Sequence, residues 1–307
     1  MVQRMGEIIR RMKGNRIIKT LKSVYILILK SMPDKLYLRV WYKQRTGRNI
    51  NFGNPVTFND KLQWLKLYDR KEQYIKMADK YEAKKFVSQL IGENYIIPTL
   101  GIYNRFEEID FDALPRQFVL KCTHNSGNLC ICRDKKLFDY ERAKRELEQG
   151  LKNDYSWLGR EWVYKKIPHR IIAEQYMEDE SGFELKDYKI FNFTGGGYQL
   201  IQVDYGRFSE HKRRFYSASW EKLDMTIGDY PDDESVIIEK PKVLHELLEL
   251  AKILSKGTKF LRTDFYIVRD KIYFGEMTFY PEAGQAKILP AEMDFKMGTW
   301  IELLEHC

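Results

Sequence analysis

The sequence has little of what marks secreted, membrane-spanning or zinc-binding proteins. It contains four cysteines, which form neither a CxxC pair nor a His/Cys spacing typical of zinc sites. We expect Cys122, Cys130, Cys132 and Cys307 to be reduced thiols with structural roles in a cytosolic protein. The only apolar run near the start, residues 24–29, is too short for a signal-peptide core or a membrane span. The chain is therefore expected to stay inside the cell.

The sequence also lacks internal repeats and low-complexity tracts, and its composition is that of a globular protein. Hydrophobic residues make up 44% and aromatic residues 14% of 307 positions, enough to bury a core in one large domain or two smaller ones. The formal charge is +8. A basic protein favours an anionic partner, and a nucleotide, a polyanionic glycan, a membrane surface and a nucleic acid all satisfy that condition.

The stretch from residue 260 to residue 280 predicts a β-hairpin. Two runs rich in Phe, Tyr, Ile and Val, Phe260 to Val268 and Ile272 to Tyr280, flank a short polar turn. We expect a three-residue connection, Arg269 to Lys271, which pairs Val268 with Ile272. Side chains then alternate between two faces, and one face is expected to carry four aromatic residues, Phe260, Tyr266, Phe274 and Tyr280.

On that face, the expected pairing also sets two carboxylates opposite each other. Asp264 lies opposite Glu276, and Arg262 lies opposite Thr278. Like charges facing each other oppose strand pairing, and a buried carboxylate without a partner is costly. A divalent cation such as Mg²⁺, commonly held by carboxylates and an anionic substrate, would resolve this conflict. The alternative is an edge hairpin whose charged residues reach solvent and whose Arg262 pairs with Asp264.

A second hairpin is predicted upstream, with strands Phe118 to Cys122 and Leu129 to Cys132. Its tip, residues 123–128, is small and polar and exposes backbone N–H groups that suit phosphate, with Lys121 at the base as a point charge. The tip has one glycine and no helix directly after it. An ordinary polar loop is therefore the competing interpretation.

Residues 1–50 are strongly basic and predict short amphipathic helices interrupted at Gly14 and Pro33. A basic amphipathic helix can lie on an anionic membrane leaflet, where each Lys or Arg near the surface contributes about 1 kcal/mol. The alternative is a helix packed on the domain with its basic face in solvent. The sequence does not choose between these arrangements.

The remaining pattern alternates helices and strands. Helices are expected to start at Thr57 or Asn59 and at Asp79, whose short polar side chains can cap them. The other expected elements are a strand at 95–103, a surface helix at 139–153, strands at 170–176, at 187–193 and from 198, a helix at 240–255 and a short C-terminal tail.

A basic cluster follows the strand that starts at residue 198. It comprises Arg207, His211, Lys212, Arg213 and Arg214. Such a cluster either binds a carboxylate or phosphate group or forms a solvated turn.

Seven stretches occur in a fixed order along the chain: PVTFNDKLQWLKLYDR, MADKYEAKKFV, FVLKCTHNSGN, RIIAEQYMED, DYKIFNF, RFSEHKRRFY and LRTDFYIVRDKIYFGEMTFYP. Together they resemble the ATP-grasp superfamily, and more closely the TupA-like ATP-grasp family linked to teichuronopeptide and other bacterial surface polysaccharides. The resemblance runs from about Phe52 to Trp300. It implies an α+β fold in which two subdomains clamp a nucleotide between antiparallel sheets. The implied divisions are a basic helical region (1–50), a pre-grasp subdomain (51–117), a first lobe with the phosphate loop (118–176) and a second lobe with the Mg²⁺-binding hairpin (177–307).

The resemblance also implies which residues bind the nucleotide. They are Lys80 and Lys121 at the phosphates, His124, Asn125, Ser126 and Gly127 in the phosphate loop, Glu174, Gln175 and Met177 at the adenine, and Asp187 at the ribose. Asn125 stands where a second glycine is expected. That departure either stiffens the loop or requires a left-handed backbone at Asn125, which asparagine tolerates better than most residues.

Further residues are implied for catalysis and for the metal. The catalytic residues would be Arg262, which faces the γ-phosphate, Lys121 and Lys189. The Mg²⁺ ligands would be Asp264, Glu276 and Thr278, although many ATP-grasp enzymes have Asn at the position of Thr278.

The activity that the resemblance implies is ATP-dependent ligation. The γ-phosphoryl group of ATP would activate a carboxylate as an acylphosphate, and an amine would displace phosphate to form an amide. The expected cofactors are ATP and Mg²⁺. The expected partners are a carboxylate of a glycan or lipid-linked glycan and an amino acid or other amine, with no nucleic acid. The residues expected to bind the acceptor carboxylate are Arg207, His211, Arg213 and Arg214.

Three alternatives stay open. A phosphotransferase acting on a sugar or glycan would use the same lysines and carboxylates. A glycosyltransferase is a second alternative, but no DxD motif lies in a strand-end loop. A basic glycan- or nucleic-acid-binding protein would show no nucleotide dependence. The expected location is the cytoplasm, with peripheral contact between the basic N-terminal region and the inner face of the plasma membrane.

Overall fold

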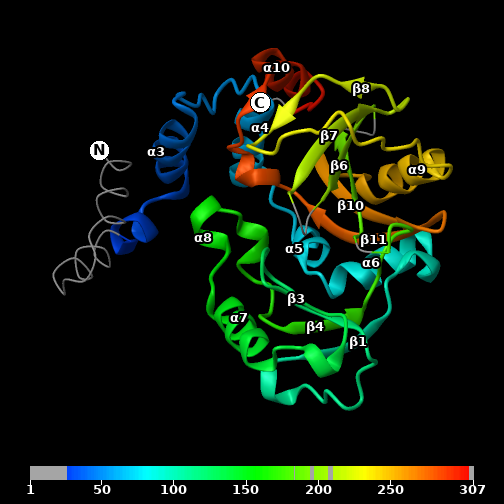
Figure 1. The fold of residues 1–307 in the computed structure, drawn as a ribbon. Helices are drawn as coiled ribbons and strands as arrows, with labels where there is room; N and C mark the ends of the chain where they lie inside the picture. The colour runs from blue at the N-terminus through cyan, green and yellow to red at the C-terminus, as the bar shows by residue number, and fades with distance from the viewer. Residues whose placement is uncertain (1–25, 183, 194–196, 207–209, 304–307) are drawn as a thin grey trace.

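The computed structural model describes residues 26–182, 184–193, 197–206 and 210–303, which form antiparallel sheets surrounded by helices (Figure 1). The four-stranded sheet has the order β1 (Thr99–Tyr103), β4 (Ile171–Gln175), β2 (Phe118–Cys122) and β3 (Leu129–Cys132). The six-stranded sheet has the order β11 (Lys271–Thr278), β10 (Phe260–Val268), β5 (Asp187–Phe193), β6 (Tyr198–Tyr205), β7 (Lys212–Ser217) and β8 (Lys222–Leu223). A two-stranded sheet pairs β12 (Ile288–Leu289) with β9 (Thr226–Ile227).

Helices cover the outer faces of the sheets and fill the space between them. The described α-helices include α3 (Asp34–Thr46), α4 (Phe58–Tyr68), α5 (Gln73–Ala78), α6 (Glu82–Ile91), α7 (Tyr140–Lys152), α8 (Ser156–Gly159), α9 (Leu244–Ser255) and α10 (Ala291–Thr299). Short 3₁₀ helices include η1 (Glu93–Tyr95), η2 (Phe106–Glu108), η3 (Lys135–Leu137), η4 (Trp162–Tyr164) and η6 (Pro281–Gly284). In Figure 1 the small sheet, with α7 and α8, lies below the large sheet, and α5 and α6 lie between them. This arrangement confirms the expected α+β class.

Alternation along β2 gives the small sheet one apolar face and one mixed face. Leu120 and Cys122 are buried and belong to one apolar cluster with Leu147 of α7. Lys121 alternates with them, so its side chain points to the opposite face. That face looks toward the large sheet, because Lys121 and Asp264 line the same cavity.

The face of the large sheet that carries Asp264 is apolar at one end and polar at the other. At the apolar end, Phe193 and Phe260 pack around Phe58 of α4, with ring centroids 5.8 and 5.0 Å from that of Phe58. Phe193 pairs with Phe260, and Lys189 pairs with Asp264 further along the same two strands. The apolar contacts with α4 therefore anchor the sheet, while the charged end faces the small sheet. α9 covers the opposite face.

The hairpin formed by β10 and β11 confirms the expected pairing of the charged residues. Asp264 is opposite Glu276, and Arg262 is opposite Thr278. The strands predicted at 118–122, 129–132 and 187–193 also have those bounds in the structure.

The expected three-residue connection in this hairpin is wrong. Val268 pairs with Lys271, so the turn consists of Arg269 and Asp270, which have positive φ angles of 51° and 58°. Two such residues form the tight turn whose twist matches that of the flanking strands. A β-bulge beside Asp264 then shifts the register by one residue, so the shorter turn and the bulge compensate for each other.

The bulge moves one aromatic side chain to the other face. Phe274, expected beside Asp264, pairs instead with Phe265 in the apolar core and is 1% exposed. Gly275 occupies the bulge, and the ring of Tyr266 lies directly over it. A Cβ atom at Gly275 would stand 3.1 Å from Cε2 of that ring.

The predicted helix starts are partly right. Thr57 caps α4 in a reciprocal capping box with Asp60, as expected. Asp79 does not start a helix: it follows α5 and accepts a hydrogen bond from the N–H of Tyr81 (2.9 Å), which turns the chain toward α6. The helix expected from residue 240 begins at Leu244.

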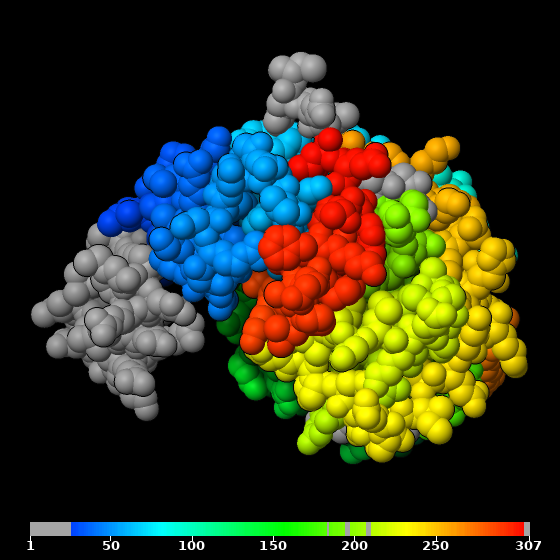
Figure 2. Space-filling model, turned by 90° about the horizontal axis from the view of Figure 1, so that it is seen from above, coloured from blue at the N-terminus to red at the C-terminus, as the bar shows by residue number. Residues whose placement is uncertain are grey.

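The expectation of a short C-terminal tail is wrong. α10 packs on α4, where Asp294 accepts a hydrogen bond from the N–H of Asn59 (3.1 Å) and pairs with Arg48 (3.1 Å). Gly298 lies so close to the chain before α4 that a Cβ atom there would stand 2.2 Å from the carbonyl oxygen of Val56. Figure 2 shows this red C-terminal segment between the blue N-terminal part of the chain and its green and yellow parts.

The basic N-terminal region is described only in part. Residues 1–25 lie outside the described residues, so the predicted helices there are not tested. α3 packs on the domain through Leu38 and Tyr42, and the Tyr42 hydroxyl donates to Asp60 of α4 (2.7 Å). No helix in the described ranges is long and apolar enough to cross a membrane.

Candidate active site

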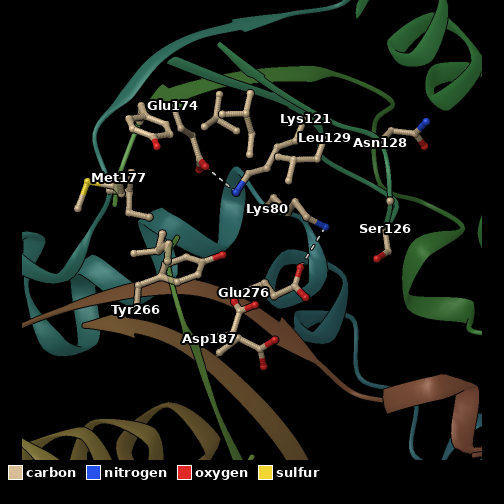
Figure 3. Close-up of a pocket in the computed structure, with 18 of the residues that line it drawn as sticks. Lys80, Lys121, Ser126, Asn128, Leu129, Glu174, Met177, Asp187, Tyr266 and Glu276 are labelled. Carbon is tan, nitrogen blue, oxygen red and sulfur yellow. Dashed lines mark ion pairs between the residues drawn. The ribbon is translucent and has the colours of Figure 1, made fainter. Parts of the chain in front are cut away.

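A cavity of about 180 Å³ lies between the small sheet and the hairpin formed by β10 and β11 (Figure 3). The residues predicted for the site that line it are Lys80, Lys121, Asn125, Ser126, Gly127, Glu174, Gln175, Met177, Asp187, Lys189, Asp264 and Glu276. In Figure 3, Met177 and Glu174 lie toward one end, and Ser126 and Asn128 lie at the other. The residues predicted at the adenine and those predicted in the phosphate loop therefore lie at opposite ends of the cavity.

Glu174, which lines this cavity, contacts two lysines. Its carboxylate oxygens lie 2.5 Å from Nζ of Lys121 and 2.5 Å from Nζ of Lys84. Burial raises the pKa of Glu174, but the positive charges of the two lysines outweigh it and leave the pKa below its ordinary value. Lys84 also donates to the carbonyl of Ile97 (2.7 Å), so it is a fixed partner. The next residue, Gln175, donates its backbone N–H to Pro98 (3.0 Å), so that N–H is already used within the fold.

Asp264 is the centre of a buried charge network on the large sheet. Arg262 donates two hydrogen bonds of 2.7 Å to its carboxylate, and Nζ of Lys189 lies 2.5 Å from Oδ2. Asp264 is 1% exposed and Arg262 is 9% exposed, so these charges do not reach solvent as the edge-hairpin alternative requires. The pairing of Arg262 with Asp264 does occur. Lys189 also lies 3.7 Å from Asp187, the residue predicted at the ribose.

Glu276 is paired across the cavity with Lys80. Their side chains lie 3.2 Å apart, and Arg262 lies 3.6 Å from the same carboxylate. Burial raises the pKa of Glu276, but the charges of Lys80, Lys189 and Arg262 hold that pKa well below its usual range. Lys80 also donates to the backbone carbonyl of Asn125 (2.6 Å), which ties the loop to the hairpin.

The two opposed carboxylates are the side chains that would hold a Mg²⁺ ion. Glu276 is ionised at neutral pH, and Asp264 stands directly opposite it, so hard oxygen ligands face one another. The Thr278 hydroxyl accepts a hydrogen bond from Arg262 (3.1 Å). Across the described part of the chain, no group of three or more His, Cys, Asp or Glu side chains is arranged to hold a metal. Phosphate oxygens and water would have to supply the remaining ligands.

The loop at residues 123–128 is held by α7 and differs from the expectation at two residues. The ring of His124 is buried away from the cavity, stacked 3.6 Å from the ring of His169. Burial and the neighbouring imidazole lower the pKa of His124 to about 4. The Asn125 side chain donates to the carbonyl of Gly150 (3.1 Å), and the positive φ of 95° belongs to Gly127. Asn125 therefore stiffens the loop and is not left-handed.

The predicted basic cluster is divided between the two faces of β7, because Lys212 to Ser217 form a strand and not a turn. Arg214 pairs with Asp232 (2.7 Å) and donates to the carbonyl of Val236 (2.8 Å), which makes it part of the fold. Arg207 lies outside the described residues.

Arg213 and His211 lie together around one carboxylate. Arg213 donates to Asp204 (2.8 Å), and Nε2 of His211 lies 3.5 Å from the same residue. Both side chains also contact the ring of Tyr230, at 4.1 Å for Arg213 and 4.5 Å for His211. Burial raises the pKa of Asp204, but its partners outweigh this and the pKa is lowered.

Sequence reasoning missed several charged residues near the cavity. Lys84 gave no signal beyond a lysine in an amphipathic helix, and its contact with Glu174 depends on how α6 packs. Glu161 lies in the stretch between α7 and β4, for which the sequence gave no prediction. It is 6% exposed; burial raises its pKa, the charge of Lys66 opposes this rise, and the charge of Glu282 adds to it.

The chain matches the family described as TupA-like ATPgrasp over residues 60–302. No curated protein matches it. Among solved structures, it is similar to the D-alanine–D-alanine ligase from Helicobacter pylori, with 15% identity, a TM-score of 0.42, and coverage of 81% of this chain and 70% of that one. It is also similar to the L-amino acid ligase from Bacillus licheniformis, with 13% identity, a TM-score of 0.42, and coverage of 74% of this chain and 49% of that one.

A third similar structure is the D-alanine–D-alanine ligase from Bacillus anthracis complexed with ATP, with 17% identity and a TM-score of 0.38. The match covers 74% of this chain and 60% of that ligase, so the chain spans less than two thirds of that relative. At these TM-scores the structural similarities carry no argument about activity. The family match alone covers most of the chain, and on that match this chain belongs to the TupA-like ATP-grasp family.

Proposed function

We propose that this chain is an ATP-dependent carboxylate–amine ligase that attaches an amino acid or other amine to a carboxylate of a bacterial surface polysaccharide or its precursor. The observation that carries the proposal is one cavity in which Lys80 and Lys121 stand at one wall and the opposed carboxylates of Asp264 and Glu276 at the other. Family membership supports ATP use. The polysaccharide substrate rests on the sequence resemblance.

The cavity suits transfer of a phosphoryl group to a carboxylate. The adenine would lie toward Met177 and the phosphates toward Ser126, at the opposite end of the cavity. Arg262 and Lys80 would stabilise the negative charge on the transferring phosphoryl oxygens, which is most of what such catalysis needs. Mg²⁺ bound at Asp264 and Glu276 would neutralise further phosphate charge. The product is an acylphosphate, and an amine displaces phosphate from it.

A phosphotransferase would use the same lysines and carboxylates, so its products distinguish it. The purified protein is incubated with Mg·ATP, a mixture of D-glucuronate and D-galacturonate, and a mixture of the standard amino acids. A ligase yields ADP, free phosphate and an amide, detected by mass spectrometry. A phosphorylated sugar without free phosphate would show a kinase, and no nucleotide turnover would contradict both activities.

The proposed location is the cytoplasm, with contact to the inner face of the plasma membrane. The described chain supports this where Leu27 and Ile28, 68% and 55% exposed, precede the exposed Lys30. Apolar residues beside lysines suit an anionic bilayer surface. The protein is expected to sediment with vesicles that contain phosphatidylglycerol and not with neutral vesicles. Equal sedimentation with both would contradict the contact.

A further inference from the structure

A second group of acidic and tyrosine side chains lies next to the phosphate end of the cavity. Tyr155 lies within hydrogen-bonding reach of Ser126 of the phosphate loop. Burial raises the pKa of Tyr155, and the charges of Glu161, Glu276 and Glu282 raise it further. The ring of Tyr164 meets that of Tyr155 edge to face, with centroids 5.1 Å apart. We call Tyr155, Glu161, Tyr164 and Glu282 the acidic cluster. It adjoins both the phosphate loop and the predicted metal ligand Glu276.

Glu161 is a buried member of this cluster, and its carboxylate has no hydrogen-bond donor among the described residues. The residue is 6% exposed. The carboxylate points toward η6, because a Cβ atom at Gly159 would meet Oε1 of Glu161 at 2.4 Å and Cβ of Ala283 at 3.1 Å. A buried carboxylate without a donor is costly unless a cation supplies the missing interaction.

Lys66 is a buried cation whose charge acts on Glu161, but its hydrogen bonds go to other groups. Its Nζ donates to the side chain of Gln63 (3.0 Å) and to the carbonyls of Gly159 and Ala283 (2.7 Å each). Burial and the neighbouring Glu282 raise the pKa of Glu161, while the charge of Lys66 acts in the opposite direction. Lys66 therefore joins the backbone at Gly159 to that at Ala283 and leaves the Glu161 carboxylate oxygens available.

Glu282 of the acidic cluster lies in a loop with an unusual backbone conformation. Three consecutive residues of η6, Glu282, Ala283 and Gly284, have left-handed φ angles of 50°, 52° and 62°. For residues with a side chain this conformation costs roughly 1 kcal/mol or more each. The side chain of Gln63 stabilises the loop by donating to the carbonyls of Ala283 (2.9 Å) and Gly284 (2.7 Å). The Glu282 carboxylate lies 3.5 Å from the guanidinium group of Arg213.

We propose that Glu161 and Glu282 bind the ammonium group of the amine substrate, with the rings of Tyr155 and Tyr164 beside it. This inference rests on the proposed ligase function. Two carboxylates provide charge-assisted acceptors for a primary ammonium, and aromatic rings favour a neighbouring cation. The substrate class is a primary amine, such as the amino group of an amino acid. The position next to Ser126 and Glu276 places it beside the phosphate that is transferred.

The same carboxylate can prepare the amine for reaction. Glu161 accepts one proton from the ammonium, which frees the nitrogen lone pair. That pair attacks the acyl carbon of the acylphosphate, the C–O bond to phosphate breaks, and phosphate leaves with the bonding electrons. The second nitrogen proton goes to the departing phosphate. The products are an amide, hydrogen phosphate and a protonated Glu161, which returns its proton to solvent, so atoms and charge balance.

The test compares two nucleophiles on the same acylphosphate. Wild-type, Glu161→Gln and Glu282→Gln proteins receive Mg·ATP with D-glucuronate and D-galacturonate, and then either the standard amino acids or hydroxylamine. Hydroxylamine is uncharged in neutral buffer, so it needs neither a carboxylate partner nor a proton acceptor. We expect the ratio of amide to hydroxamate to fall by at least about tenfold in each variant, as loss of a charge-assisted hydrogen bond predicts.

The matched control is Glu221→Gln, an exposed glutamate before β8, for which the ratio should equal that of the wild type. A wild-type ratio in both Glu161→Gln and Glu282→Gln would overturn the amine site. An equal loss of both products in folded variants would overturn it too, because the residues would then serve the first half-reaction. Glu282 is partly exposed, so its variant tests the site even if Glu161→Gln does not fold. A wild-type protein that forms no hydroxamate would instead overturn the proposed function, and the amine site with it.

Discussion

The ammonium group of Lys80 lies 3.2 Å from the Glu276 carboxylate, so a predicted phosphate ligand is paired with a predicted metal ligand. Its second contact is the Asn125 carbonyl in the phosphate loop, at 2.6 Å. Each of these groups is expected to contact Mg·ATP or its metal. Binding of the nucleotide is therefore expected to exchange an internal ion pair for contacts with phosphate and Mg²⁺.

Replacing Lys80 by methionine is expected to weaken Mg·ATP binding by about tenfold or more, because one charge-assisted contact with phosphate is lost. Isothermal titration with a non-hydrolysable ATP analogue measures the change in Kd. Lys76→Met is the matched control, since Lys76 is an exposed lysine of α5, the helix that precedes Lys80. Equal Kd values for Lys80→Met and the wild type would contradict the assignment of Lys80 to the phosphates.

Asp264→Asn is expected to remove Mg²⁺-dependent ATP turnover and also to destabilise the fold. The substitution leaves Arg262 and Lys189 without the buried carboxylate that neutralises them, which costs about 3–5 kcal/mol when one partner of a buried pair is removed. Urea unfolding measures the free energy, and phosphate release measures turnover. Asp270→Asn, in the exposed turn of the same hairpin, should change neither. A variant with full turnover would exclude Asp264 as a metal ligand.

The predicted pairing of Asp264 with Glu276 is correct because two errors in the prediction of this hairpin cancel each other. Alternation of polar and apolar residues fixed which side chains share a face of β10, and that part is robust. The turn was assumed one residue too long and the bulge at Gly275 was not foreseen, so Phe274 was assigned to the wrong face. A bulge depends on what packs above it, here the ring of Tyr266, and no local pattern shows that.

Contacts between distant segments were beyond sequence reasoning for the same reason. The roles of Lys84 and Glu161 arise only when α6 and the stretch before β4 are brought against the cavity. The split of the basic cluster follows from strand alternation in β7, which separates Arg213 from Arg214. The sequence left open an anion-binding cluster or a solvated turn, and a strand was not predicted there. Most residues predicted from the family resemblance, in contrast, line one cavity.

Gly275→Ala is expected to disturb both the bulge and the cavity. The added Cβ atom would stand 3.1 Å from the Asp264 carbonyl and 3.1 Å from the Tyr266 ring, so the ring must move. Overpacking of this kind costs about 1–3 kcal/mol of unfolding free energy. Because Tyr266 lines the cavity, Mg·ATP binding should weaken as well. Gly182→Ala is the control for a glycine with no neighbour near its Cβ position, although its φ of 73° carries its own strain. Unchanged nucleotide affinity in Gly275→Ala would show that the position of the Tyr266 ring does not affect Mg·ATP binding.

Acid should destabilise the protein through Glu174, and the sign follows from its pKa. The lysine partners outweigh burial and lower the pKa of Glu174 below its ordinary 4.5, so the folded chain binds fewer protons than the unfolded chain in mildly acidic solution. The stabilisation is then complete above the unfolded pKa and is lost as pH falls through the folded pKa.

Glu174→Gln tests this directly, since Glu174 is 4% exposed and pairs with Lys84 and Lys121. The substitution should cost about 3–5 kcal/mol of unfolding free energy near pH 7 and less near pH 3, because below its ordinary pKa Glu174 takes up a proton in the unfolded wild type and the advantage of the folded charge shrinks. Urea unfolding at both pH values measures the difference. Glu72→Gln is the control, because the Glu72 side chain is 77% exposed and its small effect should not depend on pH in this way. An equal cost at both pH values would mean that the Glu174 variant acts through packing and not through charge.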